Sequence, residues 1–232
     1  MRAMILAAGR GERMRPLTDH TPKPLLQAAG KPLIIYHIEA LVGAGITEIV
    51  VNSAWLGDQI VQTLGDGAAW GANIQHSREQ TALETAGGIA RALPLLGSSP
   101  FLLMNGDVFT DWNPEQAIAA ARQMRARDAD MWLLMVDNPA HHQHGDFALD
   151  ETGRLSDGGT GALTYSGIGV YDPRCFAGLD PDRAQALPPL MRQCMHARRV
   201  LGTHYRGRWD DIGTPERLAA LNASLHPGAD TQ

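Results

Sequence analysis

A short apolar run near the amino terminus leads directly into a glycine-containing loop, and this junction constrains the fold more than any other stretch. Residues 4–8, with the sequence MILAA, are typical of a buried strand. Gly9 and Gly11 follow at once, and glycine lets the backbone adopt positive φ and approach a ligand closely. Because α/β proteins bind phosphate groups where a strand ends in such a turn, we predict phosphate contacts at Ala8, Gly9 and Gly11.

Basic side chains are concentrated in and just after this loop. They are Arg10, Arg13, Arg15, Lys23 and Lys31, and the two lysines are the only lysines of the chain. The net charge is −5, so a polyanionic ligand requires positive charge gathered in one place. A lysine ammonium is a compact charge that suits a phosphate oxygen. We therefore favour a phosphate-binding site over the alternative, a turn whose charges only face solvent.

Further along the chain, β-rich runs alternate with segments of helical periodicity. Strands are predicted at 46–52, 72–77, 101–104, 130–136, 163–171 and 199–205, and helices at 32–43, 55–64, 113–127 and 187–197. This alternation predicts an α/β fold with a Rossmann-like, mostly parallel sheet and helices on both faces. We expect a single domain at residues 1–225, followed by a frayed tail at residues 226–232.

Asp107 follows the continuous apolar run at residues 101–104, directly after Asn105 and Gly106. An apolar run of this kind is typical of a strand buried on both faces of a parallel sheet. Ligands of α/β proteins bind at the carboxyl ends of such strands, so we expect Asp107 to point into the ligand crevice. The alternative is an aspartate that only caps the following loop.

Several classes of protein are not indicated. Cys175 and Cys194 lie far apart and form no C-x-x-C pair, so a disulfide framework or structural zinc site is not expected and a reducing cytoplasm is the default. No apolar run approaches the ~20 residues of a membrane helix, and no signal-peptide pattern opens the chain. The negative net charge does not indicate a nucleic-acid partner. We interpret the His-rich residues 141–144 as a solvated loop rather than a metal site.

Three motifs, in this order along the chain, resemble the signature of the sugar-phosphate nucleotidylyltransferases. They are Gly9-x-Gly11-x-Arg13-x-x-Pro16-Leu17-Thr18 with Pro22-Lys23-Pro24-Leu25-Leu26, then Gly106-Asp107, then Trp209-Asp210-Asp211-Ile212-Gly213-Thr214-Pro215-Glu216. The resemblance implies a glycosyltransferase-A-like nucleotidyltransferase domain. It also implies a reaction in which a sugar 1-phosphate attacks the α-phosphorus of a nucleoside triphosphate and pyrophosphate leaves.

The same resemblance implies the roles of the charged residues. Arg13 is expected to clamp the triphosphate, and Lys23 to bridge the sugar phosphate and the α-phosphate. Asp107 and Asp211 are expected to hold Mg²⁺, the cofactor, for which two carboxylates and phosphate oxygens form a suitable set of hard ligands. Arg13, Lys23 and Asp107 are thus the candidate catalytic residues.

The segments expected to contact the base depart from the pattern of the family. Glu79, Gln80, Glu84 and Thr85 are the candidate base-contacting residues, and Gly106 is added as a further nucleotide contact. The family has a glycine where this chain has Glu84, and a carboxylate at Glu79 could accept a hydrogen bond from uracil. Thr85 has the alternative of a simple helix N-cap.

The segments expected to contact the sugar depart further from the family pattern, because the Glu-Lys-Pro segment of the family is missing. Asn105, Glu151 and Gly167 are the candidate sugar-binding residues. Glu151 is the nearest acid to the missing segment and has the alternative of a solvated turn residue. Gly167 has the alternative of a strand bulge.

Within the family the resemblance is greatest to short bacterial uridylyltransferases of cell-wall recycling. It implies UTP and N-acetylmuramic acid 1-phosphate as substrates, a cytoplasmic enzyme without a membrane partner, and a monomer or weak dimer. Two alternatives stay open. One is a hexose-1-phosphate guanylyl- or thymidylyltransferase, and the other is a non-catalytic regulatory subunit that binds a nucleotide sugar.

Overall fold

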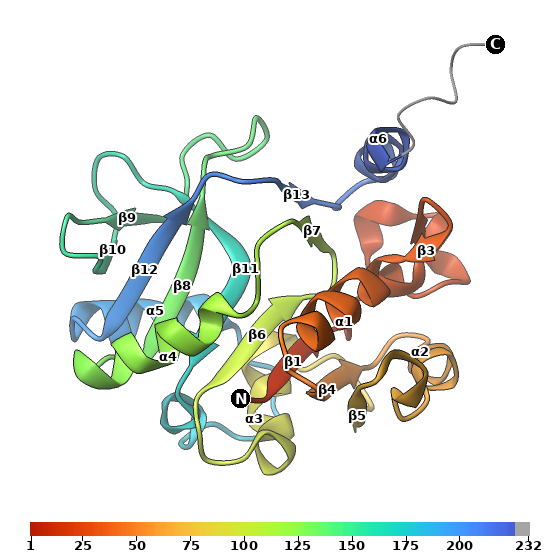
Figure 1. Cartoon of the computed structure of the whole chain (residues 1–232), viewed down its shortest axis with the longest axis horizontal. Helices are drawn as coiled ribbons and strands as arrows, with labels where there is room; N and C mark the ends of the chain where they lie inside the picture. The colour runs from red at the N-terminus through yellow and green to blue at the C-terminus, as the bar shows by residue number, and fades with distance from the viewer. Residues whose placement is uncertain (226–232) are drawn as a thin grey trace.

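The computed structural model describes residues 1–225 and is built on a seven-stranded sheet (Figure 1). The strand order is β12-β8-β11-β6-β1-β4-β5. The bounds are β1 (Ala3–Leu6), β4 (Glu48–Ser53), β5 (Asn73–Arg78), β6 (Phe101–Asn105), β8 (Met131–Val136), β11 (Thr164–Tyr171) and β12 (Val200–Tyr205). Strand β11 runs antiparallel to β6 and β8, while the β12–β8, β6–β1, β1–β4 and β4–β5 pairs are parallel. The mostly parallel sheet predicted from the sequence is confirmed.

Helices cover both faces of this sheet, as the alternation of strands and helices predicts (Figure 1). On one face pack α1 (Leu33–Gly43), α2 (Gly57–Leu64) and α4 (Gln116–Ala126), and on the other α3 (Glu84–Leu96) and α5 (Leu187–His196). Ile38 and Met124 belong to the first apolar core, and Ile89 and Met191 to the second. The two cores fix the sheet from both sides, so the ends of its strands are firmly positioned.

The segment after β1 folds as a tight loop with three single-turn 3-10 helices, η1 (Glu12–Met14), η2 (Leu17–Asp19) and η3 (Lys23–Leu25). Gly11 has φ +68, and a Cβ on it would lie 3.1 Å from Thr18 Cγ2 and 3.2 Å from Lys23 Cβ. Glycine is therefore required at this position both by the backbone conformation and by the close packing of Lys23.

Short elements bring the middle and the end of the chain together. Strand β7 (Val108–Thr110) pairs antiparallel with β13 (Trp209–Asp211), and Asp211 lies opposite Val108. Helix α6 (Pro215–Leu225) then begins at the proline, and the Thr214 hydroxyl accepts a hydrogen bond from Arg217 N. The remaining elements are β2 (Gln27–Ala28), β3 (Lys31–Pro32), β9 (Phe147–Leu149), β10 (Leu155–Asp157), η4 (Ala68–Trp70) and η5 (Pro173–Phe176).

One predicted helix starts later than expected. The sequence places it at 113–127, whereas α4 begins at Gln116. The Asn113 side chain accepts a hydrogen bond from Glu115 N, and this local turn precedes the helix instead of capping it. The predicted tail at 226–232 lies outside the described residues. Across residues 1–225, no helix has both the length and the apolar character needed to cross a membrane.

Candidate active site

A cavity of about 220 Å³ opens at the carboxyl ends of β1, β4 and β6. This is the edge of a parallel sheet at which α/β proteins bind ligands. The cavity brings together seven of the residues predicted from the sequence and adds backbone and apolar neighbours. Its lining consists of Leu6, Ala7, Ala8, Gly9, Lys23, Pro24, Asn52, Ala82, Glu84, Thr85, Asn105 and Asp107.

Lys23 and Asp107 form an ion pair at this cavity. Lys23 Nζ donates to Asp107 Oδ2 at 2.5 Å, although the two residues are 84 positions apart. The lysine is only 8% exposed, because its stem packs against the glycine loop, whereas a third of the Asp107 side chain is accessible. The ammonium is thus fixed beside a carboxylate at a strand end, with little freedom to swing into solvent.

Asp211 is held next to the Asp107 segment by the pairing of β13 with β7. Ile212 N donates to Asp107 O at 2.9 Å, which joins the second and third sequence motifs directly. Asp211 Oδ2 accepts from Arg217 Nη1 at 2.7 Å and lies 3.4 Å from His141 Nε2. Both carboxylates therefore carry cationic or polar partners at the same edge of the sheet.

The Arg13 guanidinium and the Asp211 carboxylate both lie beside Gly213. A Cβ on Gly213 would lie 3.3 Å from Arg13 Nη2 and 3.1 Å from Asp211 Oδ1. The first and third motifs therefore lie next to each other at Gly213, where an added Cβ would be tightly packed. Within residues 1–225 the exposed Arg13 guanidinium makes no ion pair, so its charge is available to an anion.

Of the five cations predicted to bind phosphate, Lys23 and Arg13 remain as candidates in the structure. Arg10 and Arg15 both pair with Asp19 at 2.9 Å, and the Arg10 guanidinium also lies 3.9 Å from the centre of the Trp55 ring. Lys31 pairs with Glu39 at 2.6 Å on the surface. These three side chains stabilise the loop and the first helix, and they do not line the cavity.

Burial keeps His37 neutral beside this site. The imidazole is 3% exposed on α1, and desolvation lowers its pKa to about 4 although the nearby Asp107 charge opposes the shift. At neutral pH His37 therefore packs behind Asp107 without adding charge.

Glu79 supports the cavity from behind and does not line it. Its Oε1 accepts from Asn52 Nδ2 at 2.7 Å and its Oε2 accepts from Leu83 N at 2.9 Å. Asn52 in turn accepts from Ala7 N at 2.9 Å and is itself part of the lining. Gln80 also lies outside the lining. The structure therefore separates Glu79 and Gln80 from the cavity and adds Asn52, a buried strand residue without a motif signal.

We expect Glu79→Gln to act through the cavity wall. The amide cannot accept from both Asn52 and Leu83, so the unfolding free energy is expected to fall by about 1–3 kcal/mol. The KM for the nucleoside triphosphate is expected to rise more than kcat falls, as measured by denaturant unfolding and steady-state kinetics. Glu48→Gln is the matched control, because Glu48 accepts from Asn73 at an exposed position. Unchanged stability with altered discrimination between UTP and CTP would instead indicate direct contact of Glu79 with the base.

The sugar-side candidates separate into two groups. Asn105 lines the cavity, and Gly167 is packed against it. Gly167 has φ +79 at an irregularity in β11, and a Cβ there would lie 2.6 Å from Asn105 Nδ2. Gly106 is similarly confined, with Leu6 O 2.6 Å from the position of a Cβ. Both glycines thus permit close backbone approach at the cavity.

Glu151 lies away from these residues. It is exposed in the turn between β9 and β10, where Arg127 Nη1 donates to Thr152 O at 2.7 Å. Arg127 follows α4 and precedes the amino end of β8, so this turn faces away from the carboxyl ends that form the cavity. The structure does not bring Glu151 to the other candidates. His141 is exposed in the loop that the sequence predicts to be solvated, and its Nε2 lies 3.4 Å from Asp211 Oδ2.

Residues 2–157 match the nucleotidyl transferase family. The chain is 52% identical to an N-acetylmuramate alpha-1-phosphate uridylyltransferase of Neisseria meningitidis serogroup B, over 96% of this chain and 97% of the relative. It is 36% identical to a protein of the same name from Caulobacter vibrioides, over 96% of each. The chain therefore belongs to the nucleotidyl transferase family, among the sugar-phosphate nucleotidylyltransferases. The family resemblance of the three sequence motifs is confirmed.

More distant proteins share the fold. A mannose-1-phosphate guanyltransferase beta-B of Xenopus laevis is 29% identical over 93% of this chain and 62% of the relative. A crystal structure of a putative glucose-1-phosphate thymidylyltransferase from Bacillus anthracis superposes with a TM-score of 0.84 at 20% identity, covering 100% of this chain and 97% of the other. This structural likeness confirms the predicted fold class.

Proposed function

We propose that this chain transfers the uridylyl group of UTP to N-acetylmuramic acid 1-phosphate and releases pyrophosphate. The observation that carries the proposal is the proximity of residues from three distant motifs: Lys23 pairs with Asp107, Ile212 N donates to Asp107 O, and Arg13 and Asp211 both lie beside Gly213. The choice of UTP and of this sugar rests on the 52% identity to a relative of that name. The cytoplasm is the compartment that the proposal implies.

Catalysis of this transfer requires mainly that the protein position the two substrates and neutralise their negative charge. A sugar phosphate oxygen is already anionic at neutral pH, so no general base is required to activate it. The obstacle is the repulsion between this phosphate and the triphosphate, which cations in a partly desolvated cavity offset. The buried Lys23 ammonium is suited to lie between the two phosphates, and Arg13 to hold the leaving pyrophosphate.

The carboxylates fit a hard divalent cation. Asp107 and Asp211 supply four oxygens from neighbouring segments, which is the donor chemistry that Mg²⁺ prefers. These two residues would hold the ion, which when bound neutralises phosphate charge and polarises the α-phosphorus. Lys23 and Arg217 each pair with only one oxygen, Oδ2, of these carboxylates, so we assign the Oδ1 atoms of Asp107 and Asp211 to the ion.

The cavity lining supports assignments for the remaining groups. Ala8 and Gly9, which line the cavity, and the nearby Gly11 would face the phosphates, and the start of α3 at Glu84 and Thr85 would face the base. On the opposite wall, Asn105 and the adjacent Gly167 would face the sugar. Because Glu79 and Gln80 lie outside the lining, we assign them to the support of the base-side loop.

A panel of substrate pairs tests the function. Pyrophosphate release is measured for UTP, dTTP, GTP, CTP and ATP, each with the 1-phosphates of N-acetylmuramic acid, N-acetylglucosamine, glucose and mannose. We expect UTP with N-acetylmuramic acid 1-phosphate to give a kcat/KM at least about tenfold above every other pair, as a difference of about 1.4 kcal/mol allows. Preference for GTP or dTTP with a hexose phosphate would contradict the proposal. Nucleotide binding without turnover of any pair would indicate the regulatory alternative.

A further inference from the structure

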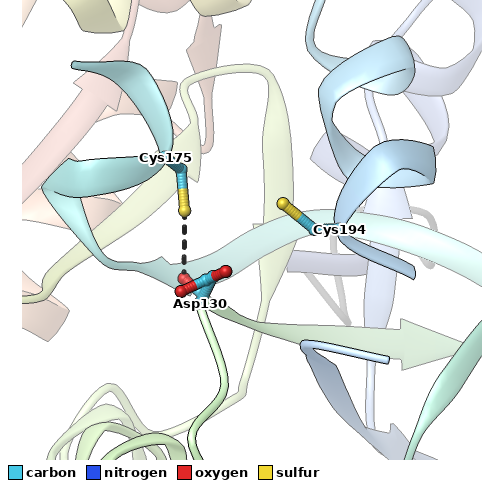
Figure 2. A group of neighbouring side chains, drawn as sticks. All are labelled: Asp130, Cys175 and Cys194. Atoms are coloured by element: carbon cyan, nitrogen blue, oxygen red, sulfur yellow. Dashed lines mark hydrogen bonds between the residues drawn. The ribbon is translucent and has the colours of Figure 1, made fainter. Parts of the chain in front are cut away.

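The only two cysteines of the chain lie side by side in the fold, although they are 19 positions apart in the sequence (Figure 2). Cys175 is in η5 and Cys194 is in α5, and their sulfur atoms and an Asp130 carboxylate oxygen all lie within 4.8 Å of one another. Figure 2 shows the two sulfur atoms entering the same space from different elements, with the Cys175 thiol donating to Asp130 O at 3.4 Å.

The charges around this group disfavour a metal ion. The Asp130 carboxylate accepts from Arg174 Nε at 2.7 Å and from Arg199 Nη2 at 2.9 Å, and Arg199 Nε is a further donor. Two guanidinium groups thus occupy the carboxylate that would have to bind the metal, and they would repel a divalent cation. Of the three side chains, only the two thiols are therefore available for a reaction.

We propose that Cys175 and Cys194 are a reversible oxidation site that forms an intrachain disulfide on exposure to hydrogen peroxide. A Cys194 sulfur attacks one peroxide oxygen, the O–O bond breaks, and the released hydroxide takes up the thiol proton as water. The resulting sulfenic acid loses its hydroxyl to the Cys175 proton as a second water when the Cys175 sulfur forms the S–S bond. Two thiols are oxidised, and the peroxide is reduced to two waters.

The electrostatic setting assigns the first step to Cys194. The neighbouring Cys175 thiol lowers the pKa of Cys194, and the Arg199 guanidinium acts in the same direction against burial. The same interaction raises the pKa of Cys175, so that thiol keeps its proton. A thiol with a lowered pKa beside a partner thiol that keeps its proton is the arrangement of a redox-sensitive pair.

The proposed disulfide would constrain a loop that supports the cavity. Residues 177–186 join η5 to α5, and both of these elements contact α3. Within this loop Gln185 O accepts from Ala86 N at 2.9 Å and from Gly87 N at 3.2 Å, while Gln185 N donates to Leu83 O at 2.9 Å. These contacts hold the first turn of α3, where Thr85 lines the cavity. A cross-link between Cys175 and Cys194 closes this loop covalently.

The test compares the 232-residue protein in its reduced form and after treatment with hydrogen peroxide. We expect intact mass to fall by about 2 Da, peptide mapping to give a Cys175–Cys194 link, and dithiothreitol to reverse both. Amide hydrogen exchange at Ala86 and Gly87 is expected to slow by roughly tenfold in the oxidised form, because the cross-link limits opening of the loop. The comparison uses one wild-type chain, so it does not depend on the folding of a variant.

Cys175→Ser and Cys194→Ser are the controls, and neither is expected to show the mass loss or slower exchange after peroxide. Three results would overturn the proposal: disulfides between chains, irreversible gain of oxygen without the cross-link, or unchanged exchange in the cross-linked protein. Stoichiometric binding of zinc alone, with protection of both thiols from alkylation, would also overturn it in favour of a metal centre.

Discussion

Asp107→Asn is expected to lower kcat by at least about 10³-fold while the protein stays folded. The substitution keeps the shape of the side chain but removes the charge that is proposed to hold Mg²⁺ and that orients Lys23 at 2.5 Å. The fold should survive because the bond from Ile212 N goes to the Asp107 backbone oxygen, which is retained. Pyrophosphate release and thermal unfolding are measured on the same preparation.

Two further measurements distinguish a metal ligand from a residue that only orients Lys23. The Mg²⁺ concentration for half-maximal activity is expected to rise in Asp107→Asn, because one of two proposed ligands has lost its charge. Asp210→Asn is the control, since Asp210 is one residue from the proposed ligand Asp211 but pairs with Arg208 at 3.0 Å. Its kcat is expected to stay within about threefold of wild type, as for most surface substitutions. Retention of more than about a tenth of the activity by Asp107→Asn would contradict the assignment.

The parts of this site that sequence reasoning predicted are those tied to strand ends. Asp107 follows an apolar run, and the Gly9–Gly11 turn follows another, so a parallel sheet necessarily places both at one edge. The fold class follows from the same alternation of strands and helices. The position of Asp211 could not be predicted from a strand end alone, because it depends on the pairing of β13 with β7, which lie about a hundred residues apart in the sequence.

The sequence does not predict which charged side chains pair with one another in the folded protein. Arg15 and Lys31 look as available for phosphate as Lys23 does, but Asp19 and Glu39 reach them in the folded chain. Glu79 looks like a base contact by position, yet its two oxygens are used by Asn52 and Leu83. These partners come from other elements, and side-chain pairing over such separations leaves no periodic signal in the sequence.

The contacts of His141 with Asp211 and of Cys175 with Cys194 also join residues from different elements, so the sequence does not predict them either. In most sequences, a His-rich loop or two isolated cysteines do not indicate a functional contact. Asp211 is placed by the pairing of β13 with β7 and Cys194 by its position on α5, and composition and spacing do not encode such long-range contacts.

The two lysines of the chain provide the sharpest test of the electrostatic proposal. Lys23→Met keeps the length and packing of the side chain but removes its charge, and we expect kcat to fall by about 10²–10⁴-fold, or about 3–5 kcal/mol of transition-state stabilisation. Stability should change little, because a third of the Asp107 side chain is exposed and the unpaired carboxylate can be hydrated. Lys31→Met is the matched control and is expected to retain activity, since Lys31 pairs with Glu39 on the surface.

Two companion variants separate a phosphate contact from a merely structural ion pair. Lys23→Arg should not restore activity, because the planar guanidinium needs more width than the site beside Gly11 leaves and presents its charge differently. If Lys23 served only to neutralise Asp107, combining Lys23→Met with Asp107→Asn would recover activity relative to Lys23→Met alone. We expect no recovery, because each residue is proposed to act on substrate or metal, and a double-mutant cycle on kcat/KM measures this directly. Full activity of Lys23→Met would refute the proposed placement of its ammonium between two phosphates.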